Sequence, residues 1–192
     1  MESTQPIDFL HVYDDYADFV WRTVRRLGVD PTSAEDVFQE VFVVVHRRLD
    51  DFEGRSSVRT WLFGITLRIV RNHKRALGRK RHEGGEQAEI AIDRAPASGR
   101  DQPEARTQRA QAVRLLHEVL DTLDDDKREV FVMAELEQMS GAAIAEVTGL
   151  NQSTVYARLR GARQQFDQAV KRLSAKRDWA RHRPAPRERR TR

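Results

Sequence analysis

Cysteine is absent from this 192-residue chain. A disulfide framework and a thiolate metal site both require cysteine, so both are excluded. No apolar run approaches the roughly 20 residues that a membrane-spanning helix needs. The first residues, MESTQPIDFL, also lack the basic and then apolar layout of a signal peptide. These absences predict a cytoplasmic protein without direct membrane insertion.

Signs of catalysis are absent as well. The six histidines are scattered, without HExxH or HxH spacing. No glycine-rich phosphate loop and no serine nucleophile elbow occurs. Carboxylates are plentiful, but none is paired on an apolar face in the manner of a general acid and base. We therefore predict that the chain is not an enzyme and uses no cofactor and no metal.

Positive charge is concentrated in two segments, although the formal net charge is only +4. Residues 175–192 hold eight Lys or Arg against two acidic residues, and residues 68–82 hold seven Lys or Arg and no acid. Acidic residues cluster at 35–53 and 118–129. This segregation indicates separate faces for an anionic polymer and for a basic protein partner, although charged helices also segregate charge for solubility alone.

Helical periodicity dominates the chain and predicts an all-α fold. In the first half, apolar residues recur at helical spacing in 14–27 and 32–49, and a third helix begins near Thr60. The second of these opens with the sequence TSAE at 32–35, which predicts a capping box. The first half therefore reads as a small helical bundle.

The second half also reads as helical. A segment at 83–104 with paired glycines and two prolines predicts a flexible linker. Helical periodicity resumes after it, and Asp124 or Asp125 caps the next helix. We predict two small helical domains, at 1–82 and 105–174, and a basic disordered tail at 175–192.

Residues 140–163 have the pattern of a helix-turn-helix. Ala145, Gly149 and Val155 fall where that motif needs a small residue, a positive-φ residue and an apolar residue beneath the second helix. Asn151 or Gln152 would begin the second helix, and Asn151 is the better N-cap. An ordinary helical hairpin with solvated arginines is the alternative, because three spaced residues are a modest signal.

Two longer runs resemble a known family. Residues 34–65, AEDVFQEVFVVVHRRLDDFEGRSSVRTWLFGI, closely resemble region two of the extracytoplasmic-function (ECF) sigma factors of bacterial RNA polymerase. Residues 122–163 resemble their region four, and both runs occur in the family's order on either side of a linker. The resemblance implies a sigma factor that binds core RNA polymerase and directs promoter-specific transcription initiation, in a stress or signal response.

In the family, the region-two helix docks on a clamp coiled coil of the polymerase large subunit. Phe42 and Val43 lie outside the predicted core stripe of this helix, so we expect an exposed apolar patch rimmed by carboxylates. For Asp36 and Glu40, compensation of the helix dipole is the alternative role. The resemblance assigns core-polymerase binding to Asp36, Gln39, Glu40, Phe42 and His46.

The loop at 53–59 and the helix after it match the part of the family that opens the minus-ten promoter element. Gly54 and nearby hydroxyl groups would line a pocket for an extruded base, while basic residues including Lys74 would hold phosphates. Trp61 is either a stacking wedge or, as its TWL motif favours, a core residue. The candidate minus-ten residues are Arg55, Ser56, Ser57, Arg59, Trp61, Arg68, Arg71, Asn72, Arg75, Arg79 and Lys80.

The second helix of the helix-turn-helix would enter the major groove at the minus-thirty-five element, with its first residues directed at base edges. Arg158 and Arg163 would hold phosphates or, alternatively, acidic groups of their own domain. The candidate minus-thirty-five residues are Gln152, Ser153, Tyr156, Ala157, Arg158, Arg160 and Arg163.

Some positions depart from the family's pattern. The family usually has Asn where this chain has Arg68 and Asp where it has Asn72, and Ser153-Thr154-Val155 replaces a common GTV. These departures lie on both DNA-binding faces, so the promoter sequence of this chain is expected to differ from that of its relatives.

Two other interpretations explain less of the sequence than a sigma factor does. A stand-alone helix-turn-helix regulator would bind duplex DNA without polymerase, but it leaves residues 34–65 unexplained. A degenerate sigma-like adaptor that acts mainly through protein contacts is disfavoured by the intact basic faces. The resemblance also implies an anti-sigma factor as a partner, because family members are commonly held inactive by one that is often attached to a membrane.

Overall fold

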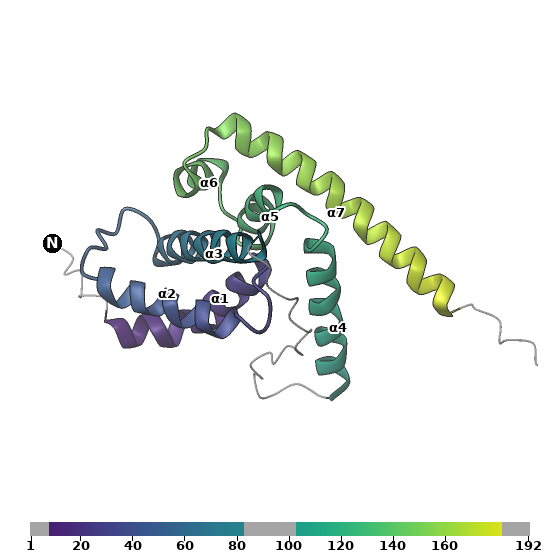
Figure 1. The fold of residues 1–192 in the computed structure, drawn as a ribbon, viewed down its shortest axis with the longest axis horizontal. Helices are drawn as coiled ribbons and strands as arrows, with labels where there is room; N and C mark the ends of the chain where they lie inside the picture. Colours follow the sequence, from purple (N-terminus) through teal and green to yellow (C-terminus); the bar gives the residue numbers. More distant parts are fainter. Residues whose placement is uncertain (1–7, 83–102, 182–192) are drawn as a thin grey trace, which may run out of the picture.

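The computed structural model describes residues 8–82 and 103–181, and within these ranges it contains helices and no strand (Figure 1). The all-α prediction is therefore confirmed for the part of the chain that the structure describes. The predicted linker, apart from its last two residues, and the end of the predicted tail lie outside the described residues.

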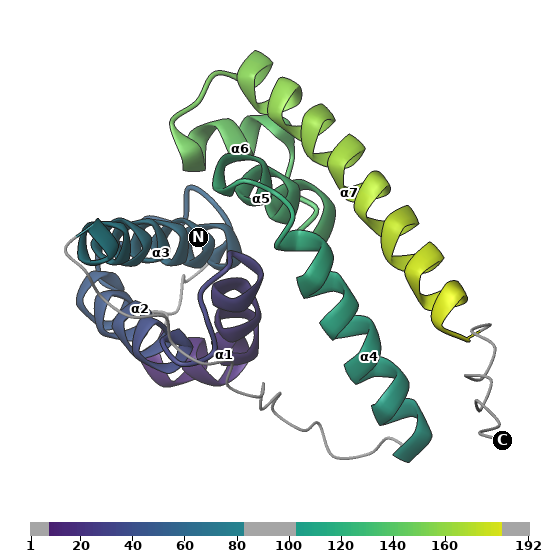
Figure 2. The ribbon, with the colours of Figure 1, turned by 45° about the vertical axis from the view of Figure 1, so that its right-hand side comes forward.

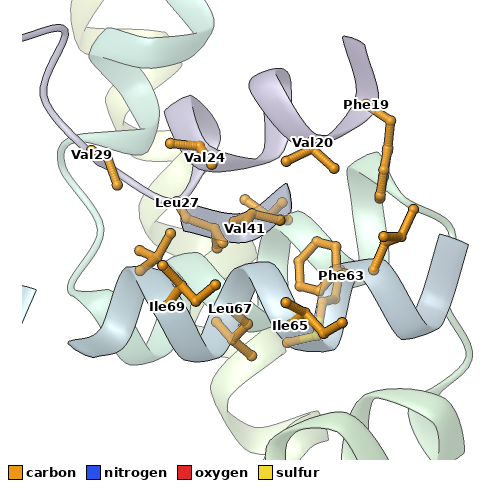
Figure 3. Packing of buried hydrophobic residues seen from close by; sticks show 14 of the residues in the cluster. Phe19, Val20, Val24, Leu27, Val29, Val41, Phe63, Ile65, Leu67 and Ile69 are labelled. Atoms are coloured by element: carbon orange, nitrogen blue, oxygen red, sulfur yellow. The ribbon is translucent and has the colours of Figure 1, made fainter. Parts of the chain in front are cut away.

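The first half is a bundle of α1 (Phe9–Arg26), α2 (Ala34–Arg48) and α3 (Val58–His82). Each of these helices contacts the other two. Figure 3 shows Val20 and Val24 of α1 directed toward α3, which contributes Phe63 to the same core. This packing satisfies the apolar stripes that the sequence places on each helix.

Helix α1 begins at Phe9, several residues earlier than its apolar stripe predicts, and this changes the environment of Phe42. The Phe42 ring lies 4.7 Å from that of Tyr13 and 6.3 Å from that of Phe9, and the side chain is only 5% exposed. The expectation that Phe42 lies outside the core is therefore wrong, because the first turns of α1 cover it. Val43 is 48% exposed, as expected.

The predicted capping box at the start of α2 is also wrong. The N-cap residue is Ser33, and its side chain makes no cap hydrogen bond. Instead, Oδ1 of Asp30 accepts hydrogen bonds from the backbone N–H groups of Thr32 and Ser33, both at 3.0 Å. An Asx turn before the helix thus replaces the expected cap at its first turn.

The second half contains α4 (Pro103–Leu120), α5 (Asp125–Phe131), η1 (Val132–Leu136), α6 (Gly141–Thr148) and α7 (Gln152–Arg181). Helix α7 packs against α4, α5 and α6 and is the long helix at the edge of the molecule (Figure 2). Asp124 caps α5 by accepting the N–H of Lys127 at 2.9 Å. Since α7 continues to Arg181, the prediction of a disordered tail is wrong for residues 175–181, where good helix formers precede the first proline of the tail.

A π-helical turn, η1, connects α5 to the loop before α6. Glu137 N–H donates to the Val132 carbonyl at 3.0 Å, five residues back, and Met139 N–H, beyond the turn, donates to the Met133 carbonyl at 2.9 Å. Gln138, between them, has a φ of 55°, which is uncommon for a residue with a Cβ atom. The turn therefore ends in an irregular backbone segment that sets the direction of Glu137.

The two halves pack against each other, which the sequence pattern did not predict. Helix α3 contacts α6, and buried apolar residues of both halves belong to one cluster. Figures 1 and 2 both show α5 lying beside α3. The molecule is thus closed, with one face of the N-terminal bundle covered by the C-terminal half.

Candidate nucleic-acid and polymerase interfaces

The turn between α6 and α7 has the geometry of a helix-turn-helix. Gly149 has a φ of 72°, and its N–H donates to the Ala145 carbonyl at 2.9 Å. Val155 of α7 is fully buried. Asn151 is the N-cap, since its Oδ1 accepts the N–H of Thr154 at 2.8 Å and α7 begins at the next residue.

The first turns of α7 present an open polar surface. Tyr156 is 54% exposed and rests on Gly141, where an added Cβ atom would lie 2.6 Å from the tyrosine Oη. Any residue larger than glycine at position 141 would therefore displace the tyrosine ring. The exposed candidate residues on this surface are Gln152, Ser153, Tyr156, Ala157 and Arg160.

Two other arginines of α7 are engaged by carboxylates of their own half. Arg158 pairs with Asp126 at 2.7 Å, and Arg163 pairs with Glu135 at 2.6 Å. The sequence allows these arginines either to bind phosphates or to pair with acidic groups of their own domain. In the structure, both pair with acidic groups of their own half.

One face of α2 is open to solvent. Asp36, Gln39, Glu40 and His46 are exposed on it together with Val43. The His46 ring lies edge-on to that of Phe9, with centroids 4.9 Å apart. The aromatic side chains of α1 and α2 thus support a surface that carries polar groups around an exposed valine.

The loop before α3 carries the candidate base pocket. Gly54 has a φ of 70°, and the exposed Arg55 pairs with Glu53 at 2.8 Å. Oγ of Ser57 accepts the N–H of Thr60 at 3.1 Å, so this hydroxyl caps the start of α3. Ser56 is half-buried beside it.

Trp61, at the start of α3, belongs with the core rather than with the open surface. Its side chain is partly buried against the hydrophobic cluster, and its ring lies 5.1 Å from that of Phe52. This is the core position that the TWL motif favours.

The candidate DNA-binding residues along α3 fall into two groups. The exposed residues are Arg68, Asn72, Arg75 and Arg79, and the side chain of Lys80 lies outside the described residues. Arg59, whose side chain is 51% exposed, and the half-buried Arg71 contact carboxylates of the second half. Arg59 donates to Glu137 at 2.5 Å, and Arg71 donates to Glu129 through Nε at 2.9 Å.

The pairing with Glu129 stabilises the charged form of Arg71. Its hydrogen bond to that carboxylate raises the pKa of the guanidinium, and partial burial opposes the rise. The sequence gave no indication of this pairing, because no spacing along the chain relates a residue of α3 to one of α5.

Neither a helix able to cross a membrane nor a cluster of three or more potential metal ligands is found in residues 8–82 and 103–181.

Known protein families match both halves of the chain. Sigma-70 region 2 matches residues 12–80, and Sigma-70, region 4 matches residues 114–176. Among curated relatives, the RNA polymerase sigma-H factor of Pseudomonas aeruginosa is 31% identical over 153 residues, which is 78% of this chain and 79% of that protein. The ECF RNA polymerase sigma factor SigC of Mycobacterium tuberculosis is 33% identical over 147 residues, 75% of this chain and 73% of that protein.

Solved structures agree on the fold. The sigma factor RpoE of Bartonella quintana, solved with the anti-sigma factor NepR, superposes with a TM-score of 0.70 at 20% identity, over 85% of this chain and 97% of that one. CnrH, solved with the cytosolic domain of CnrY, superposes with a TM-score of 0.58 at 25% identity, over 85% and 87% of the two chains. Because family matches cover both halves in order, the chain belongs to the ECF subfamily of sigma-70 RNA polymerase sigma factors, which direct the polymerase to promoters.

Proposed function

We propose that this sigma factor divides its work among three surfaces: α2 for core polymerase, the loop at 53–59 with α3 for the minus-ten element, and the start of α7 for the minus-thirty-five element. The observation that supports this most directly is the exposed first turn of α7, capped by Asn151 and carried on a helix-turn-helix. Such a helix end is the part that reads base edges in this motif.

The α2 surface suits a basic amphipathic helix. Asp36 and Glu40 offer carboxylates, Gln39 offers an amide, and Val43 offers apolar area between them. Phe42 acts from below in this proposal, because its buried ring fixes the position of the exposed residues beside it. His46 extends the same surface toward the end of α2.

The minus-ten surface would combine a base pocket with phosphate contacts. Ser56 and Ser57 would form the pocket with the backbone at Gly54, beside Arg55 and Arg59. Basic side chains along α3 would hold the duplex through phosphates, which contributes salt-dependent affinity rather than sequence choice. Trp61 would support this surface from beneath, through its packing against the hydrophobic core. The residues proposed for phosphate and strand contacts along α3 are Arg68, Arg71, Asn72, Lys74, Arg75, Arg79 and Lys80.

The minus-thirty-five surface would read bases in the major groove. Gln152 suits adenine, Arg160 suits guanine, and the methyl group of Ala157 suits thymine. Ser153 and Tyr156 complete the reading face. Arg158 and Arg163 would flank it, and their carboxylate partners hold them in place.

We further propose that an anti-sigma factor regulates this chain in the cytoplasm and that the chain has no catalytic activity of its own. Two structural relatives support the first part, since RpoE was solved with NepR and CnrH with CnrY.

Core binding and promoter-directed initiation test the proposal together. The double variant Asp36→Ala/Gln39→Ala should weaken binding to purified core polymerase while leaving helicity unchanged, because both side chains are exposed. Asp15→Ala is the matched control, since it removes one carboxylate from an exposed site on α1. Transcription by the reconstituted holoenzyme on a promoter library should then start at defined sites, and the double variant should reduce it. Unchanged core affinity in that variant would refute the docking surface, and duplex binding without any core association would favour a stand-alone regulator.

A further inference from the structure

Glu137 lies at the boundary between the two halves, with its side chain only 2% exposed. Its Oε1 accepts a hydrogen bond from Arg26 of α1 at 2.8 Å, and its Oε2 accepts one from Arg59 of α3 at 2.5 Å. A buried carboxylate is costly unless opposite charges compensate it, and here arginines of the other half compensate both oxygens. One buried carboxylate therefore fastens the C-terminal half to the N-terminal bundle.

A second set of contacts lies along the same boundary. Glu129, whose side chain is 10% exposed, accepts hydrogen bonds from both Nε and Nη2 of Arg71. Asp125 pairs with Lys74 beside them. The paired arrangement on Arg71 is the same geometry with which arginine binds a phosphate group.

These contacts occupy the cations proposed for the minus-ten surface. Arg59, Arg71 and Lys74 are all candidates for that surface. Both oxygens of Glu129 hold the Arg71 guanidinium, whereas Arg59 and Lys74 each bond one carboxylate oxygen. The donors used in these contacts cannot bind a phosphate at the same time. A cavity of about 300 Å³ also lies at this boundary, lined by Ser57 and Thr60 of one half and by Met139 and Ser140 of the other. Ser57, one of the residues of the candidate base pocket, therefore faces the C-terminal half.

The backbone around Glu137 is shaped for this contact. The π-helical turn ends at Leu136, directly before it, and Gln138 after it has a positive φ. Rare backbone conformations of this kind persist where the surrounding structure requires them. Here they direct Glu137 toward Arg26 and Arg59.

We propose that this closed arrangement is an autoinhibited state of the free chain, in which carboxylates of the C-terminal half take the place of promoter phosphates. Glu137 acts as the latch, because it is the most buried of these carboxylates and holds arginines from two helices. Only the open form binds DNA through the minus-ten surface, so the fraction of open molecules sets the apparent affinity. This inference rests on the proposed DNA-binding role of Arg59 and Arg71.

Arg26→Gln tests the latch without touching a candidate DNA-binding residue. It removes one of the charges that hold Glu137, and the free variant should bind a fluorescent DNA duplex with an unpaired bubble about tenfold more tightly than the wild type. Arg22→Gln is the matched control, because it removes the same charge from an exposed site one turn earlier in α1. Simple loss of positive charge should weaken DNA binding in that control. If Arg26→Gln weakens binding as the control does, the latch is overturned.

Domain separation gives a readout that needs neither DNA nor polymerase. Since the chain has no cysteine, Asp51→Cys and Gln168→Cys place a dye pair on exposed sites of the two halves. Single-molecule energy transfer should show one high-transfer population in the wild type, and part of it should move to lower transfer in Arg26→Gln and in Glu137→Gln. Glu146→Gln, an exposed carboxylate on α6, should leave the distribution unchanged. A wild type as open as Glu137→Gln would overturn the proposal, and circular dichroism confirms that each variant retains its helices.

The two proposals fail in different measurements. If the halves open as expected but the holoenzyme starts no transcript at a defined site, the proposed DNA-binding roles are wrong and the closed contact stands. If the wild type directs initiation normally but energy transfer does not respond to Arg26→Gln or Glu137→Gln, the latch is wrong and the proposed function stands.

Discussion

Nη1 of Arg128 occupies the space that a Cβ atom on Gly28 would fill, only 1.8 Å from the ideal Cβ position. Gly28 ends α1 with a φ of +87°, whereas Arg128 belongs to α5, so this contact joins the two halves. Arg128 is 6% exposed, donates through Nε to the Leu120 carbonyl at 2.8 Å and pairs with Asp121 at 2.6 Å. Position 28 thus needs glycine for its backbone conformation and for the approach of Arg128.

Replacement of Gly28 should therefore destabilise the protein. In Gly28→Ala, the left-handed backbone alone should cost about 1–2 kcal/mol, and displacement of Arg128 should add to that loss. Gly78→Ala is the control, because nothing lies within 4 Å of a Cβ atom added to this exposed site in α3. That control should gain about 0.5–1 kcal/mol. Urea unfolding measures both, and equal stability of the two variants would contradict the close approach at Gly28.

Phe42 should matter for stability. Because its ring is buried among Phe9, Tyr13 and Phe38, Phe42→Ala should lower the free energy of unfolding by about 3–5 kcal/mol. Val43→Ala on the adjacent exposed site should change it by less than about 0.5 kcal/mol. Thermal or urea unfolding distinguishes the two, and a mild effect of Phe42→Ala would mean that α1 does not cover this ring.

Val43 should matter for core binding instead. Val43→Asp places a charge at the centre of the proposed docking surface, so core affinity should fall by about tenfold or more while unfolding changes little. Asp15→Asn, on an exposed part of α1, serves as the control for a surface substitution in the same half. Core binding by fluorescence anisotropy measures the effect, and full affinity of Val43→Asp would place the docking surface elsewhere.

The turn before α7 could be predicted from the sequence, whereas the local capping box expected at the start of α2 is wrong, and contacts between distant segments could not be predicted. Gly149 and Asn151 act within one turn, so their roles follow from residue type and spacing. The sequence pattern predicts an exposed Phe42, because the apolar stripe of α1 does not reveal that this helix begins as early as Phe9. Glu137 carries no local signal at all, since Arg26 lies 111 residues away and their pairing depends on how the halves meet.

The cap of α5 should make stability depend on pH. The side-chain hydrogen bond from Lys127 lowers the pKa of Asp124 below 3.8, against a smaller opposing effect of burial. Since the pKa is lower in the folded than in the unfolded chain, this contribution is fully present above about pH 4 and is lost as the pH falls through the folded value. Asp124→Ala should cost about 1 kcal/mol at pH 7 and less in acid.

Asp8 provides the control for this cap. It is the N-cap of α1, but its side chain makes no cap hydrogen bond, so Asp8→Ala should cost much less than Asp124→Ala at pH 7. Thermal unfolding at neutral and acidic pH compares the two variants. A cost for Asp124→Ala that stays constant into acid would exclude the ionised carboxylate as its source.

Arg160 and Arg158 should differ in their effect on promoter choice. Arg160 is exposed on the reading face, so Arg160→Ala should remove about 1–3 kcal/mol of discrimination at one base pair of the minus-thirty-five element. Arg158 pairs with Asp126 and is 27% exposed, so Arg158→Ala should leave base preference unchanged and lower stability modestly. Both variants lose one positive charge, which makes each a control for the other.

Transcription from a promoter library by holoenzyme that contains each variant separates these effects. Holoenzyme with Arg160→Ala should start transcription from promoters with additional bases at a single position. Holoenzyme with Arg158→Ala should keep the wild-type base preference but give less transcript overall. Core binding should be the same for both, because neither residue lies in the half that carries the proposed docking surface. An unchanged library profile for Arg160→Ala would remove this arginine from the reading face and would leave Gln152 and Tyr156 as the side chains to substitute next.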